Sequence, residues 1–115
     1  ETAYYNQEHN NQKIKEVIKI PLVQVNGIFD KYFSNGCDFC SLDVEGLEIS
    51  ILNSIDFSKH RPLIFCIETL AYEKCIKDSY KEQETIDFLL KNNYFIYADT
   101  FMNTIFVDKT QWEKL

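Results

Sequence analysis

The stretch from Ser41 to Leu52 constrains the fold more than any other part of the chain. It continues a short apolar run that begins at Phe39 and has the length of a β-strand. Gly46 then marks a sharp turn of the backbone. Leu47, Ile51 and Leu52 follow at the spacing of one helix face. The stretch therefore predicts a buried strand that leads through a tight turn into an amphipathic helix.

Three acidic residues accompany this strand–helix junction. Asp43 lies near the carboxyl end of the strand, which is the end where ligands bind in open α/β sheets. Glu45 and Glu48 fall in the first turn of the expected helix, where the helix dipole favours anions. We expect Glu48 to cap and orient the junction. Asp43 points to a functional role, because a charge that ends a buried strand is costly unless something pairs with it or uses it.

The rest of the chain alternates strands with helices, which favours an α/β fold with a mostly parallel sheet. Residues 1–13 are polar and aperiodic, so we expect a loop or disorder there and a single α/β domain over residues 14–115. The expected elements are a half-buried strand over 14–23, a helix from Val25 to Phe33, a buried strand over Leu63–Ile67, a helix within 79–91 capped by Asp78 or Ser79, and a closing hairpin of Tyr94–Ala98 and Thr104–Val107. We expect His60, in a polar connection, to be solvated.

Composition limits the partners and the compartment. With 115 residues, the chain is large enough for one core. A net charge of −6 argues against nucleic acid and anionic membranes as partners, since both require basic patches. No apolar run approaches the ~20 residues of a transmembrane helix. No signal peptide is evident, and Cys40 and Cys66 lie in apolar strand patterns, so we expect a reduced, cytoplasmic chain.

The strand–helix stretch resembles the core signature of a known enzyme family. The run Phe39–Glu48, with Ile51 and Leu52 behind it, is similar to the signature of the FkbM family of S-adenosylmethionine-dependent methyltransferases. Further matches follow in the family's order and together cover residues 18–108. They are Ile20–Val25 with Phe29–Tyr32, Arg61–Thr69, Asn93–Tyr94 and Asn103–Val107. The acid that is usual near Asn26 is absent.

The resemblance implies a fold and an activity. The fold would be the three-layer carboxyl half of a Rossmann-like methyltransferase sheet, mostly parallel with a C-terminal antiparallel hairpin. The parent protein would transfer a methyl group from S-adenosylmethionine to a hydroxyl, on a sugar or another small-molecule substrate. The chain has three glycines, at positions 27, 36 and 46, and none forms the G-x-G of a cofactor-binding loop. We therefore expect this fragment alone neither to bind the cofactor tightly nor to be active.

The candidate catalytic residues are Asp43, Glu45 and Glu68. If the strands ending near Asp43 and Glu68 are parallel neighbours, both carboxylates share one rim of the sheet, and Glu45 joins them from the helix start. Mutual repulsion should then raise at least one pKa. Such a cluster can hold a divalent metal, act as a general base on a hydroxyl, or bind a cation. The resemblance implies that these positions face the cofactor and substrate pocket.

Two other readings of the sequence stay open. A non-catalytic α/β interaction module would have kept only the half-sheet. A receiver-like or phosphatase-like domain would hold Mg²⁺, but it needs an early acidic pair, which is missing, and Lys109 is its only candidate lysine. In the family sheet the signature strand is central, so its edge would be open here. We expect that edge to be covered by residues 14–23 or by a second copy of the chain in a homodimer.

Overall fold

The computed structural model of the chain describes residues 16–71 and 80–115, so the expectation for residues 1–13 lies outside it. Asp78 and Ser79 also lie outside it, and the helix that one of them was expected to cap begins at Gln83 with Glu82 as its N-cap, which corrects that expectation. The larger sheet contains β1 (Phe39–Leu42), β2 (Ile64–Glu68), β5 (Tyr94–Asp99) and β6 (Asn103–Asp108), and the smaller one β3 (Leu70–Ala71) and β4 (Tyr80–Lys81). The helices are α2 (Val25–Tyr32), α3 (Glu48–Ser54), α4 (Gln83–Lys91) and α5 (Lys109–Trp112). The expected central elements are therefore present, within a few residues of their expected bounds.

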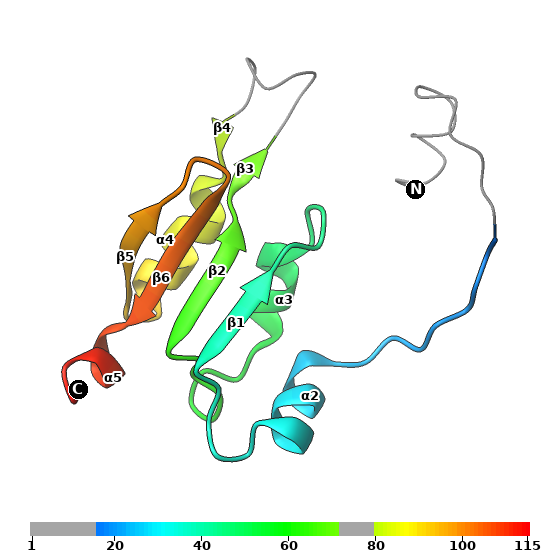
Figure 1. Cartoon of the computed structure of the whole chain (residues 1–115), viewed down its shortest axis with the longest axis horizontal. Coiled ribbons are helices and arrows are strands. Elements are labelled where there is room, and N and C mark those ends of the chain that lie inside the picture. The colour runs from blue at the N-terminus through cyan, green and yellow to red at the C-terminus, as the bar shows by residue number, and fades with distance from the viewer. Residues whose placement is uncertain (1–15, 72–79) are drawn as a thin grey trace.

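The larger sheet has the strand order β1-β2-β6-β5 (Figure 1). Only β1 and β2 pair in parallel, whereas β2–β6 and β6–β5 are antiparallel. The expectation of a mostly parallel sheet is therefore wrong. The cause is the closing hairpin. Its second strand, β6, inserts between β2 and β5. The first strand of the hairpin, β5, which follows helix α4 in the chain, therefore pairs with β6 and not with β2.

The described helices α3 and α4 lie behind the same face of this sheet in Figure 1. Buried side chains of the sheet, among them Phe65, Ile67 and Phe106, form one core cluster with Leu52 of α3 and Leu89 of α4. Burial of this apolar surface is the main stabilising term of the domain. Burial alternates along β2, where Phe65 and Ile67 are buried and their neighbours are half-buried. This pattern fits a strand with one covered face.

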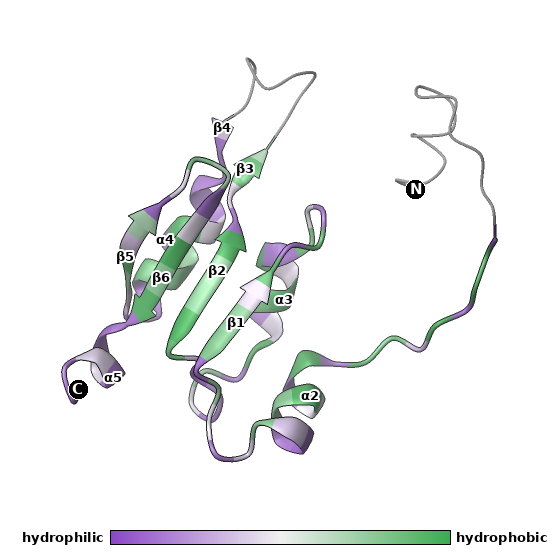
Figure 2. Cartoon of the chain, in the orientation of Figure 1, coloured by the Kyte–Doolittle hydropathy of each residue, from purple (hydrophilic) through white to green (hydrophobic). Residues whose placement is uncertain are grey.

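On the opposite face of the sheet, no helix from residues 16–71 and 80–115 covers the strands. The apolar strands face the viewer in Figure 2 without a helix in front of them. An apolar pocket of about 350 Å³ lies there, and Trp112 of the short helix α5 contributes to its lining. Its lining residues are Phe39, Ile64, Tyr97, Ile105, Val107 and Trp112. The three-layer arrangement is therefore not present in the described part of the chain, which has two layers.

Residues 16–24 precede α2 and form no strand, which corrects the expectation of a half-buried strand over 14–23 for the part of it that the structure describes. They run away from the sheet as an extended segment (Figure 1). Ile18, Ile20 and Leu22 are exposed on it. Pro21 has no N–H to donate to a neighbouring strand, which disfavours pairing through the middle of this segment.

None of the helices in residues 16–71 and 80–115 combines the length and the apolar character needed to cross a membrane.

Candidate functional site

The carboxyl ends of β1 and β2 bring acidic side chains together. Asp43 directly follows β1, and Glu68 is the last residue of β2, which is the parallel neighbour of β1. One carboxylate oxygen from each of Asp43, Glu48 and Glu68 lies within 4.8 Å of the others. The geometric expectation for Asp43 and Glu68 is therefore met. The third member of this close group is Glu48, while Glu45 lines the adjoining pocket.

The loop between β1 and α3 is shaped by two consecutive residues in the left-handed region. Glu45 has φ +54° and Gly46 has φ +94°. A residue with a Cβ is strained there, at a cost of about 1 kcal/mol, so this conformation persists only where the surroundings enforce it. Glu45 consequently precedes α3 instead of belonging to its first turn. Strain of this kind gathers at functional sites, and Glu45 is exposed beside the acidic group.

Glu48 enforces the loop conformation. Its carboxylate accepts hydrogen bonds from the backbone N–H of Val44, at 2.8 Å, and of Gly46, at 2.9 Å. The residue is 3% exposed and is the first residue of α3. Both carboxylate oxygens are thus committed to the backbone. This geometry supports the expected capping and orienting role of Glu48, which holds Asp43 and Glu45 in place on either side of Val44.

We expect Glu48→Ala to lower the free energy of unfolding by about 2 kcal/mol, because it removes a buried carboxylate that accepts two charge-assisted hydrogen bonds. Urea denaturation followed by circular dichroism measures this loss. Glu84→Ala, an exposed glutamate in the first turn of α4, is the matched control and should cost less than about 0.5 kcal/mol. Equal effects of the two substitutions would contradict the role given to Glu48.

The pKa of Glu68 is shifted by its surroundings. Burial raises its pKa above the ordinary value, and the nearby negative charges of Asp43, Glu45 and Glu48 raise it further. Repulsion at the rim was expected to raise at least one pKa, and the affected group is Glu68. A carboxylate with a raised pKa is a stronger base than an ordinary carboxylate, which favours removal of a proton from a hydroxyl.

A pocket of about 230 Å³ opens beside these carboxylates, and a feature missed at the sequence level forms its wall. The short strand β3 pairs antiparallel with β4 and contributes both of its residues, Leu70 and Ala71, and Glu82, which follows β4, also lines the pocket. Two-residue strands are too short for their periodicity to be recognised. Glu82 carries no sequence signal either, since it reads as an ordinary residue before helix α4, where it is the N-cap.

A polar network fastens this wall to the sheet. The Lys81 ammonium donates to Thr69 Oγ1 at 3.1 Å and to Asp99 Oδ1 at 2.9 Å. The hydroxyls of Thr69 and Thr104 hydrogen-bond each other at 2.6 Å and are buried. The backbone N–H of Glu82 donates to the carbonyl of Thr69. Lys81 thus ties β4 to the sheet on one side, while the adjacent Glu82 faces the pocket.

The arrangement suits the recognition of hydroxyl or cationic groups. Four glutamates line the pocket next to an apolar wall, and carboxylates accept hydrogen bonds without donating any. Asp43, Glu48 and Glu68 are the described residues that come nearest to a cation site. Both Glu48 oxygens already accept backbone hydrogen bonds, however, so we assign no metal to this group. Asp43 and Glu68 remain available to a substrate.

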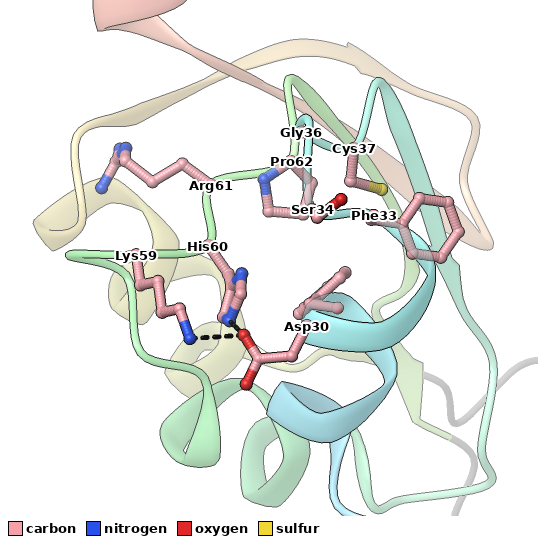
Figure 3. Close-up of a pocket in the computed structure, with 10 residues that line it drawn as sticks. Asp30, Phe33, Ser34, Gly36, Cys37, Lys59, His60, Arg61 and Pro62 are labelled. Carbon is pink, nitrogen blue, oxygen red and sulfur yellow. Dashed lines mark ion pairs between the residues drawn. The ribbon is translucent and has the colours of Figure 1, made fainter.

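A larger pocket, about 420 Å³, lies at the opposite end of the parallel strands (Figure 3). Here His60 is buried, which corrects the expectation that it is solvated. Its ring packs on Phe29 with a centroid distance of 5.3 Å, and its Nε2 atom lies 3.0 Å from Asp30 Oδ1 without hydrogen-bond geometry. Asp30 also pairs with Lys59. Because the Lys59 ammonium neutralises the Asp30 carboxylate, we regard the contacts of Asp30 with Lys59 and His60 as structural.

The fold and the acidic pocket define an α/β domain with candidate catalytic carboxylates at the carboxyl ends of two parallel strands. A family model described as the methyltransferase FkbM domain matches residues 1–96. The chain therefore belongs to the FkbM methyltransferase family, as the sequence resemblance indicated. No curated protein and no solved structure matches the chain.

Proposed function

We propose that this domain is the carboxyl-terminal part of an enzyme that transfers a methyl group from S-adenosylmethionine to a hydroxyl of a sugar or another small metabolite. Family membership supports methyl transfer. The observation that supports a hydroxyl acceptor is the close approach of Asp43 and Glu68 beside a pocket rich in carboxylates. A polyol presents several O–H donors and some apolar C–H surface, which matches acidic side chains next to Leu70 and Ala71.

In this proposal Glu68 acts as the general base. Its carboxylate takes the proton from the acceptor hydroxyl, because burial and neighbouring charge give it a raised pKa and therefore a higher proton affinity. Asp43 and Glu45 accept hydrogen bonds from the reacting hydroxyl or from its neighbours and so orient the substrate. Glu48 has no free oxygen for this purpose and holds the loop that carries the other two.

We propose that the described residues form only part of a cofactor site. The tight loop after β1 directs two backbone N–H groups, of Val44 and Gly46, at the Glu48 carboxylate, so neither is available to the carboxylate of S-adenosylmethionine. The chain also has no G-x-G sequence. We therefore derive no step through the cofactor, and we propose that upstream sequence supplies its site.

We expect the 115-residue chain to bind S-adenosylmethionine more weakly than micromolar in calorimetric titration. The natural coding sequence upstream of Glu1 should contain a strand followed by G-x-G and a later acid that binds the ribose hydroxyls. Micromolar binding to the isolated chain would show that the cofactor site is complete without that region. If the natural protein instead starts at Glu1, the proposal of methyl transfer is refuted and an alternative, non-catalytic function is favoured.

That alternative is a non-catalytic interaction module, and the apolar face of the sheet that no described helix covers favours it. Aromatic side chains such as Tyr97 and Trp112 are enriched at the centres of protein interfaces, and both are about half exposed here. Methyl transfer would depend on the acidic pocket, whereas binding by an interaction module would not. Substitution of Glu68 should abolish methyl transfer but should leave binding through the opposite sheet face unchanged.

A further inference from the structure

One side-chain nitrogen attaches the wall of the acidic pocket to the larger sheet. Lys81 lies on β4, and its ammonium group has three protons to donate. Three oxygens accept them, and each belongs to a different segment, namely the end of β5, the interior of β6 and the residue after β2. They are Asp99 Oδ1 at 2.9 Å, Thr104 Oγ1 at 3.4 Å and Thr69 Oγ1 at 3.1 Å.

The strands β3 and β4 depend on this attachment for their position. They form only two residue pairs with each other, Leu70 with Lys81 and Ala71 with Tyr80. A pair of short strands that packs on nothing else is marginally stable in water. In Figure 1 they extend beyond the end of β2, next to the turn between β5 and β6, and Tyr80 is 54% exposed. Loss of the Lys81 hydrogen bonds should therefore allow β4 to open locally while the sheet stays folded.

The residue that β4 carries to the pocket is Glu82, which follows Lys81 directly and lines the pocket. Glu82 is the N-cap residue of α4, but its side chain makes no cap hydrogen bond. Thr85 Oγ1 lies 3.5 Å from its Oε2 atom, at the limit of a hydrogen bond. The Glu82 carboxylate is therefore available to a ligand, in contrast to that of Glu48, which accepts two backbone hydrogen bonds.

We propose that Lys81 is a positioning residue for the methyl acceptor, because it holds Glu82 where that carboxylate binds an acceptor hydroxyl that does not react. This inference rests on the proposed function and adds to it that the acceptor carries at least one further hydroxyl. A hydrogen bond from a hydroxyl to a carboxylate is stronger than one to a neutral oxygen. A contact away from the reacting atom orients the substrate for the reaction.

The proposed base, Glu68, is held independently of Lys81. Glu68 is the last residue of β2 and pairs with Asn103 of β6 in the antiparallel ladder. Loss of the Lys81 ammonium should therefore displace Glu82 and leave Glu68 in place. Removal of a contact that is equally strong in the ground state and the transition state raises KM and leaves kcat unchanged. All of the Lys81 contacts lie within residues 69–104, so they do not depend on any segment that precedes β1.

Acceptor kinetics of the longer protein, with a radiolabelled methyl donor and a panel of polyols, provide the first test. We expect Lys81→Met to raise the KM of the acceptor about tenfold, and to change kcat and the KM of S-adenosylmethionine less than about twofold. Methionine keeps an unbranched side chain and removes the charge and the three donors. Lys91→Met, at an exposed position in the last turn of α4, is the matched control and should leave all three constants unchanged.

A double-mutant cycle tests whether Lys81 acts through Glu82. Glu82→Gln should also raise the KM of the acceptor about tenfold, because the neutral amide oxygen is a weaker acceptor. The double variant Lys81→Met, Glu82→Gln should have the KM of Glu82→Gln alone, since Lys81 then has no carboxylate to position. Glu84→Gln, exposed in the first turn of α4, makes the same change of charge outside the pocket and should have no effect.

Amide hydrogen exchange tests the attachment without methyl transfer. The N–H of Glu82 donates to the carbonyl of Thr69 at 2.9 Å, and in Lys81→Met it should exchange about tenfold faster. The amide of Phe106, in the interior strand β6, should exchange at an unchanged rate. Lys81 and Asp99 are both partly exposed, and such pairs contribute little to global stability, so the urea midpoint of unfolding should also stay the same.

Each measurement has an outcome that would overturn the proposal. Unchanged exchange of the Glu82 amide would show that Lys81 does not hold β4. A fall in kcat without a change in the KM of the acceptor would show that Lys81 affects the chemical step. Effects that multiply in the double variant would show that it acts apart from Glu82. If the unaltered longer protein methylates no polyol, the proposed function fails and the acceptor role of Glu82 fails with it, whereas the exchange measurement still decides whether Lys81 holds β4.

Discussion

Asp108→Asn is expected to lower the free energy of unfolding by about 3 kcal/mol, at the lower end of the range for breaking a buried ion pair. Asp108 is 0% exposed, and its Oδ2 atom accepts from Arg61 Nε at 2.6 Å. The guanidinium also donates to the carbonyl of Asn92 at 2.7 Å and lies over the Tyr94 ring. An asparagine amide cannot neutralise this cation, so the substitution leaves it uncompensated among buried groups. The partial exposure of Arg61 places the loss at the lower end of the range.

Urea denaturation measures this effect as a lower midpoint with an unchanged slope. Asp87→Asn, at an exposed position on α4, is the matched control and should cost less than about 0.5 kcal/mol. The double variant Arg61→Met, Asp108→Asn should lose less than Asp108→Asn alone, because the unpaired cation is then absent. A double variant that is less stable than the single one would contradict this account of the ion pair.

Glu68→Gln is expected to reduce the turnover number for methyl transfer by about 10²- to 10⁴-fold in the longer protein, which is the usual contribution of general base catalysis. Glutamine keeps the size of the side chain and a hydrogen-bond acceptor but cannot take the proton. Glu84→Gln, exposed on α4, is the control and should have no effect. A radiolabelled methyl donor with a panel of polyols provides the measurement.

The pH dependence of the reaction gives a second readout. Because the proposed base must be ionised, the rate should fall as the pH decreases through the raised pKa of Glu68. Glu68→Gln should remove this acidic limb and leave a slow, pH-independent rate. If Glu68→Gln keeps the acidic limb of the pH profile, the general base is another residue. Asp43 would be the next to test, because its carboxylate belongs to the same close group.

Much of the site could be anticipated from local patterns in the sequence. The apolar run before Asp43 and the run before Glu68 each indicate a strand, and one intervening helix requires a parallel pair with a common carboxyl end. Those two steps suffice to bring the two acids together. The role of Glu48 was also accessible, because a glutamate in the first turn of a helix has nearby backbone N–H groups to accept.

The errors came from contacts between residues that are distant in the sequence. Nothing local distinguishes a hairpin added at an edge from one whose second strand, Asn103–Asp108, inserts beside β2. His60 is buried because α2 places Phe29 and Asp30 against it, which a polar stretch of sequence does not reveal. Apolar and charged residues do alternate over residues 14–23, as they do in a half-buried strand. A strand also needs a neighbouring strand to pair with, and alternation in the sequence does not supply one.

The insertion of β6 also affects how this domain can be divided. The family match ends at residue 96, inside β5, whereas the strand that joins β5 to β2 begins at Asn103. A recombinant boundary drawn where the family match ends would delete an interior strand, detach the remainder of β5 and uncover the apolar side chains of β2. Expression of this domain therefore requires at least the residues through Asp108, whose carboxylate pairs with Arg61.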